Sequence, residues 1–105
     1  MKKFIVVYTT CPTKKEAKKI AQILVKEKLA ACCNIFEIDS VFCWKGKLEK
    51  SKEFAIFIKT KSDLYRKIEK RIKQLHSYSL PCVISFPIKK GSKEFLNWIE
   101  QSISS

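Results

Sequence analysis

The chain has 105 residues, 46% of them hydrophobic, and this size and apolar content predict a single domain, residues 1–105, with one core. No apolar run approaches about 18 residues, and the N-terminal one is too short for a secretory signal, so we expect a cytoplasmic protein without a membrane segment. The net charge of +12 comes from 20 Lys and 2 Arg against 10 acids. Scattered lysine predicts a solvated surface rather than specific nucleic-acid recognition, because arginine is the residue that reads phosphate and guanine bidentately.

The cysteines are odd in number and show no C-x-x-C spacing, so neither a disulfide framework nor a zinc knuckle is indicated. We therefore expect reduced thiols. The five cysteines are Cys11, Cys32, Cys33, Cys43 and Cys82.

The N-terminal segment predicts a strand followed by a helix. Residues 4–8 (FIVVY) form a short unbroken apolar run, which is typical of a central strand covered on both faces. Thr13 with Glu16 three positions later matches a capping box, which opens a helix. The apolar face of this helix repeats at Ala17, Ile20, Ala21 and Leu24.

The next segment predicts an unusually long hairpin. Residues 29–44 contain no Gly or Pro, a turn follows at residues 45–47, and a second strand-like run starts at Lys52. Fifteen extended residues reach roughly 50 Å, whereas a domain of this size has a radius of gyration of about 13 Å. The hairpin should overhang its own domain, so we expect an oligomer with shared clefts, because an exposed strand edge invites pairing. The overhanging end carries Phe42, Cys43 and Trp44.

The C-terminal half predicts helix, strand and helix. Ser62 is a suitable N-cap for a second helix that ends near His76. Residues 81–88 (PCVISFPI) read as the last strand, and Ser92 caps a final helix. The order β-α-β-β-α-β-α predicts an α+β fold, a ferredoxin-like split βαβ sandwich with a long β-hairpin and one extra C-terminal helix. One face of its antiparallel sheet is left bare, which is a second reason to expect assembly.

Two patches carry candidate chemistry. Cys32 and Cys33 are adjacent in a strand and therefore point to opposite faces, so one of them at most faces a given site. His76, the only histidine, lies where the second helix ends. Imidazole, thiolate and carboxylate together suit copper or zinc, and Glu53 is the carboxylate that we nominate. Simple packing of the thiols and a helix-dipole role for the histidine are the alternatives.

Six segments, in the right order across almost the whole chain, resemble the CutA, or divalent-cation-tolerance, family. The segments are VVYTTCP (6–12), LAACCNI (29–35), SVFCWKGK (40–47), FIKTK (57–61), the His76–Tyr78 pair with Pro81, and FLNW (95–98). The resemblance implies a ferredoxin-like subunit in a tight homotrimer whose hairpins pair between chains. It also implies binding of divalent metal, especially copper, near intersubunit clefts. A protein partner, which the sequence does not identify, is a separate expectation.

The resemblance also assigns site residues. Cys32 matches the cysteine of the family's LAAC motif, and His76 the histidine of its His-Pro-Tyr-Glu segment. Together with Glu53, which is nominated from its place in the chain alone, they are the predicted metal ligands. The residues predicted to line a ligand pocket in the cleft are Lys59, Tyr78, Cys82 and Trp44. The chain departs from the family pattern at Ser77, Ser79 and Cys82, which removes two carboxylate candidates and adds a soft donor near His76.

Two other classes of function remain open at this stage. RNA-recognition domains share the split βαβ order, and KEFAIF (52–57) partly matches their third-strand consensus but has Glu in place of Gly. An enzyme in the cleft would use His76 as base, Lys59 as anion anchor and Tyr78 as donor. No nucleophile and no Gly-rich phosphate loop accompany them, so we predict a protein that is not an enzyme.

Overall fold

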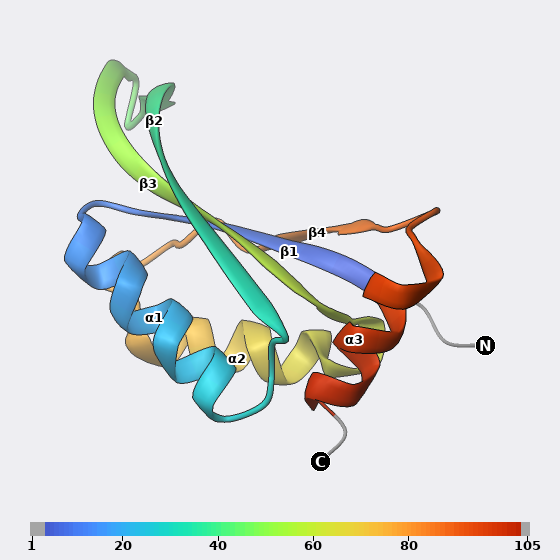
Figure 1. The fold of residues 1–105 in the computed structure, drawn as a ribbon. Helices are drawn as coiled ribbons and strands as arrows, with labels where there is room; N and C mark the ends of the chain where they lie inside the picture. The colour runs from blue at the N-terminus through green and yellow to red at the C-terminus, as the bar shows by residue number, and fades with distance from the viewer. Residues whose placement is uncertain (1–3, 104–105) are drawn as a thin grey trace.

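The computed structural model describes residues 4–103. Four strands form one antiparallel sheet in the order β2-β3-β1-β4. Helices α1 and α2 lie together under one face of this sheet (Figure 1). The predicted ferredoxin-like α+β class is therefore confirmed. The elements are β1 (Phe4–Cys11), α1 (Lys14–Lys26), β2 (Cys32–Trp44), β3 (Lys47–Lys61), a 3-10 turn (Ser62–Leu64), α2 (Tyr65–Leu75), β4 (Ile84–Pro87) and α3 (Lys93–Ile103).

The core lies between the sheet and the first two helices. Strand β1 is central, as predicted, because it pairs with both β3 and β4. Alternate side chains of β1 and β3 point towards the helices and interlock with the apolar faces of α1 and α2. Fully buried members are Val7, Ile20, Leu24, Ile56, Ile58, Ile68 and Ile72. Each such aliphatic side chain contributes about 1.5–3 kcal/mol through its removal from water.

The helix starts differ from one another. The predicted capping box of α1 is confirmed in its first half, since the Glu16 amide donates to Thr13 Oγ1 at 3.1 Å. The Glu16 carboxylate accepts from the Ser77 amide at 3.1 Å instead of completing the box at Thr13. The predicted N-cap role of Ser62 is wrong. Ser62 opens a 3-10 turn, and α2 starts only at Tyr65, after Leu64, without a side-chain cap. The amide of Phe95 donates to Ser92 Oγ at 3.2 Å, so the predicted cap of α3 is present.

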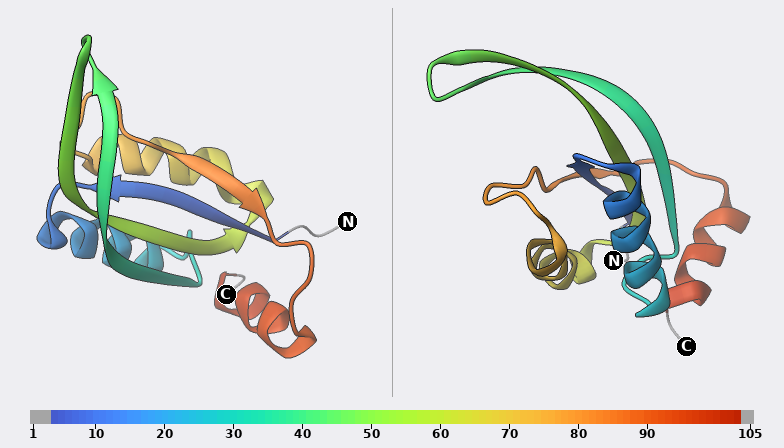
Figure 2. Two further views of the ribbon diagram at one scale, coloured as in Figure 1. Left: turned by 90° about the horizontal axis from the view of Figure 1, so that it is seen from above. Right: turned by 90° about the vertical axis from the view of Figure 1, so that its left-hand side faces the viewer.

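The hairpin of β2 and β3 overhangs the rest of the sheet, as predicted (Figure 2). Strand β1 pairs with β3 only over residues 54–61, so residues 47–53 pair with β2 alone. Seven residues at about 3.3 Å each give a free arm of roughly 23 Å. Lys45 (φ 51°) and Gly46 (φ 79°) form the two-residue turn, which lets β3 begin at Lys47, five residues before the predicted start. The exposed apolar side chains of the free arm are Val41, Phe42, Trp44 and Leu48.

The sheet face opposite α1 and α2 carries aromatic side chains. Tyr8 meets Phe57 and Phe86 edge-on, with ring centroids 5.9 and 6.3 Å apart, and Phe36 meets Phe57 at 5.2 Å. Strand β4 at the sheet edge is exposed and shorter than predicted. None of the helices within residues 4–103 is both long and apolar enough to cross a bilayer.

Candidate functional site

His76 is held by three elements at one end of the sheet. Its amide donates to Ile72 O at 2.8 Å, which ends α2, and its ring is fully buried against the end of β1. Nε2 lies 2.7 Å from the carbonyl oxygen of Thr10. A carbonyl oxygen only accepts, so Nε2 carries the proton that it donates. Nδ1 accepts from the Tyr78 amide at 3.1 Å and lies 3.3 Å from Glu16 Oε2.

Cys11 and Glu16 complete a three-donor cluster with His76. The ligand atoms of these side chains all lie within 4.8 Å of one another, and no other such cluster occurs in residues 4–103. Cys11 ends β1 and is fully buried, while Glu16 lies in the first turn of α1 and accepts from the Ser77 amide at 3.1 Å. Burial, followed by the charges of Glu16 and of Glu53, raises the pKa of the Cys11 thiol to about 12. The thiol is therefore protonated at neutral pH.

The donor set fits a borderline metal ion. Nitrogen, sulfur and carboxylate oxygen are the ligands of zinc and copper in proteins. In a tetrahedral zinc site with bonds of about 2.0–2.3 Å, ligand atoms lie roughly 3.5 Å apart. Glu16 Oε2 and His76 Nδ1 already lie 3.3 Å apart, so a bound ion would require Cys11 to approach them by up to about 1 Å.

Tyr78 links this cluster to Glu53. Its hydroxyl donates to Glu53 Oε2 at 2.8 Å, and its ring centroid lies 4.9 Å from that of His76. Burial and the hydrogen bond to the Glu53 carboxylate raise the pKa of Tyr78 to about 12. The phenol is thus a fixed donor across the neutral range.

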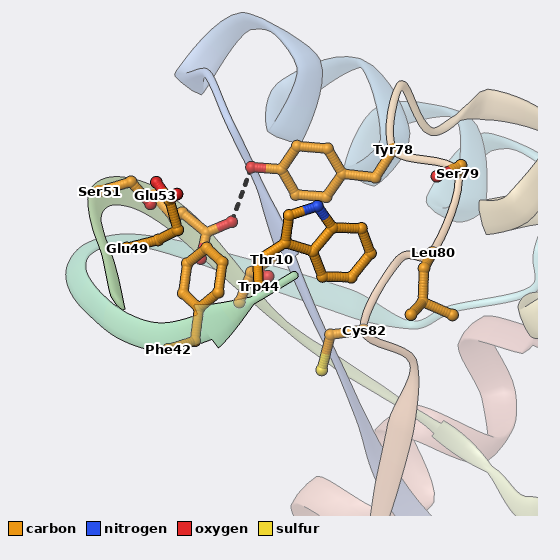
Figure 3. Close-up of a pocket in the computed structure, with 10 residues that line it drawn as sticks. All are labelled: Thr10, Phe42, Trp44, Glu49, Ser51, Glu53, Tyr78, Ser79, Leu80 and Cys82. Atoms are coloured by element: carbon orange, nitrogen blue, oxygen red, sulfur yellow. Dashed lines mark hydrogen bonds between the residues drawn. The ribbon is translucent and has the colours of Figure 1, made fainter. Parts of the chain in front are cut away.

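A cavity of about 610 Å³ opens beside Tyr78 and Glu53 (Figure 3). One wall is the hairpin arm, with Phe42 and Trp44, and the other is the loop between α2 and β4. Three residues predicted for the ligand pocket, Tyr78, Cys82 and Trp44, meet in this cavity. Glu53 lines it as well and is only 7% exposed.

Two of the predicted residues lie elsewhere. Cys32 pairs with Lys59 in the β2–β3 register, whereas Glu53 pairs six residues further along, opposite Ile38. Six residues of strand span about 20 Å, so one chain does not bring Cys32 to Glu53 and His76. Lys59 lies over the Phe95 ring, 5.4 Å from its centroid, and not in the cavity. A site that combines Cys32 with His76 requires a neighbouring chain.

The sequence reading missed Cys11 and Glu16. Glu16 had already been assigned to helix capping, and Cys11 is one of five cysteines without a spacing motif. The relevant signal was topological. In a split βαβ unit, the first strand ends at the same end of the sheet as the segment that follows the second helix. Cys11 and His76 occupy those two places.

This architecture, with its ligand cluster and cavity at one end, defines a ferredoxin-like α+β protein with an extended hairpin arm and a candidate cation site. Comparison with known proteins identifies the family. A family model described as CutA1 divalent ion tolerance protein matches residues 5–102. The divalent-cation tolerance protein CutA of Archaeoglobus fulgidus is 45% identical over 97 residues, which cover 92% of this chain and 95% of the relative. The protein of the same name from Pyrococcus horikoshii is 38% identical over 95 residues, 90% of this chain and 93% of the relative.

A solved structure supports the same assignment. The periplasmic divalent cation tolerance protein CutA from Archaeoglobus fulgidus matches with a TM-score of 0.92 and 45% identity, covering 99% of this chain and 100% of that one. The chain therefore belongs to the CutA1 divalent ion tolerance family. The names of these relatives describe tolerance of divalent cations and not a catalysed reaction.

Proposed function

We propose that this protein binds a copper or zinc ion as a non-enzymatic divalent-cation tolerance protein. The observation that carries the proposal is the convergence of Cys11, Glu16 and His76 at one point. The ligands would be Cys11 Sγ, a Glu16 carboxylate oxygen and His76 Nδ1. A bound ion there would supply the positive charge that lets the Cys11 thiol give up its proton.

The environment of His76 supports a ligand role. A metal-binding histidine usually donates its second ring N–H to a carbonyl or carboxylate, which fixes the tautomer and the ring orientation. The hydrogen bond from Nε2 to Thr10 O does this and leaves Nδ1 as the acceptor nitrogen, 3.3 Å from Glu16 Oε2. A metal ion at Nδ1 would replace the hydrogen bond that this nitrogen accepts from the Tyr78 amide. The ring is fully buried, so competition from water is weak.

We further propose that the functional form is a homotrimer in the cytoplasm. The free arm and the exposed aromatic sheet face supply unpaired edges and apolar surface for association. In such an assembly Cys32 of a neighbouring chain would be an alternative thiol ligand for a metal ion that Glu53 and His76 also bind. The five free thiols favour a reducing compartment, although the similar Archaeoglobus protein is named periplasmic.

Metal titration of matched variants tests the site. Calorimetry with ZnCl₂ should give tight binding by the wild type. Cys11→Ala and His76→Ala should each weaken binding by more than the roughly 10–100-fold that is lost when a group that only orients a metal ligand is replaced. Cys43→Ala is the control, because Cys43 is an exposed thiol at the end of the arm, and it should leave the affinity unchanged.

The same titration discriminates between the two thiols. A loss on Cys32→Ala with none on Cys11→Ala would move the site to the subunit interface and contradict the cluster proposed here. Equal, thiol-stoichiometric binding by wild type and His76→Ala would remove the site altogether.

A further inference from the structure

The cavity beside Tyr78 has a charge opposite to that of the chain as a whole. The chain carries 22 Lys and Arg and a net charge of +12. No Lys or Arg lines the cavity, but Glu49 and Glu53 do. On a chain this rich in lysine, a cavity lined by two carboxylates and no basic side chain is unusual. Its local negative charge indicates a ligand that carries positive charge.

Glu53 has no cationic partner within residues 4–103. The residue as a whole is 7% exposed, and the one hydrogen bond that its carboxylate accepts within the described residues comes from the Tyr78 hydroxyl. Fully buried carboxylates are rare unless they are paired, because desolvation of an isolated charge is costly. A cation supplied from outside would complete this site.

The walls of the cavity are aromatic. Phe42 and Trp44 project from the arm, and Tyr78 faces them from the loop, so that three rings surround the space in front of Glu53 (Figure 3). Aromatic faces attract organic cations through their quadrupole, and such rings form the cages that bind ammonium groups. Leu80 and Cys82 add apolar surface on the loop side.

We propose that this cavity binds a small organic cation, namely a primary ammonium or guanidinium group on a short aliphatic stem. The charged head would lie against Glu53 and Glu49, and the stem would pack between Trp44 and Leu80. A metal ion is a poorer match, because the three-donor cluster of residues 4–103 lies at Cys11 and not in the cavity. The volume of about 610 Å³ falls within the usual range of small-molecule pockets. This inference is independent of metal binding at His76.

The test uses n-butylammonium and n-butylguanidinium as probes, with n-butanol as the uncharged analogue of the same length. Binding is followed by calorimetry and by Trp fluorescence in the assembled protein. Both cations should bind at least tenfold more tightly than butanol. Glu53→Gln, which keeps an oxygen acceptor for Tyr78, should weaken cation binding at least tenfold and leave butanol binding within twofold.

Two further variants separate a local effect from a loss of structure. Trp44→Leu should weaken the cations because it removes an aromatic face from the arm without touching the core. Glu94→Gln removes an exposed carboxylate of α3, outside the cavity, and should change nothing. Circular dichroism checks that each variant is folded.

Three results would overturn the proposal. Equal affinity for butylammonium and butanol would show an apolar pocket without cation recognition. Unchanged cation binding in folded Glu53→Gln would place recognition elsewhere. Absence of binding by the intact oligomer, with a neighbouring chain's side chain in the cavity, would make the space part of the subunit interface.

Discussion

Removal of the Tyr78 hydroxyl should lower the free energy of unfolding by more than the loss of a single oxygen atom usually does. Tyr78→Phe deletes one oxygen atom, which donates the 2.8 Å hydrogen bond to Glu53 Oε2. Glu53 is 7% exposed, so water reaches its carboxylate only from the cavity side, and the Tyr78 hydroxyl is the one protein donor that it has among residues 4–103. Leaving a buried polar group unsatisfied costs about 1–3 kcal/mol, and more when the group is charged. We therefore expect a loss of about 2–3 kcal/mol in the free energy of unfolding.

Tyr65→Phe is the matched control. Tyr65 also donates to an oxygen, the carbonyl of Val83, but the distance is 3.3 Å and the acceptor is neutral. That variant should cost about 0.5–1 kcal/mol. The assay is urea unfolding at one fixed protein concentration in metal-free buffer, because association changes the apparent stability.

A double-mutant cycle with Glu53→Ala isolates the interaction. The coupling energy between Tyr78 and Glu53 should be about 1.5–3 kcal/mol, the range for hydrogen bonds to charged groups. A coupling near zero, or equal costs for Tyr78→Phe and Tyr65→Phe, would refute the view that Glu53 depends on this phenol.

Three other variants test separate parts of the structure. Gly46→Ala should lower stability by about 1 kcal/mol, because Gly46 has φ +79° while its Cβ would meet no atom within 4 Å; a circular-dichroism melt checks this, and an unchanged midpoint would contradict it. Thr13→Ala should cost about 1 kcal/mol by loss of the cap, and it should weaken zinc binding in calorimetry because Glu16 lies in the same turn. Burial raises the pKa of Cys33 to about 12, so the folded state holds its proton longer than the unfolded state and stability should fall between about pH 9 and 12. Alkaline unfolding of Cys33→Ala should show a smaller fall over that window.

Much of the fold was predictable because the apolar repeat that marks a strand or a helix depends only on residues that are close together in the sequence. The apolar run of β1 and the helical repeat of α1 depend on neighbouring residues alone, and both were placed correctly. The overhanging hairpin followed from the absence of Gly and Pro over residues 29–44. The start of α2 was placed wrongly because Ser62 suits a cap, but the chain turns there as a 3-10 helix.

The metal cluster was only partly predictable, because it depends on contacts between distant segments. His76 was identified from its rarity and its place at a helix end. Its neighbours come from 60 or more residues earlier in the chain, as in the 2.7 Å contact with Thr10. The sequence could not show that Cys32 lies far from Glu53 within one chain, because that distance depends on the register of β2 against β3. Cys32 pairs with Lys59, and Glu53 lies six residues away along β3.

Zinc K-edge X-ray absorption on the zinc-loaded protein tests the metal site most directly. The proposed ligands predict one sulfur at about 2.3 Å together with nitrogen and oxygen at about 2.0–2.2 Å. The sulfur shell should disappear in Cys11→Ala and persist in Cys32→Ala. A sulfur shell that survives in Cys11→Ala, or a wild-type spectrum with oxygen and nitrogen alone, would contradict the site.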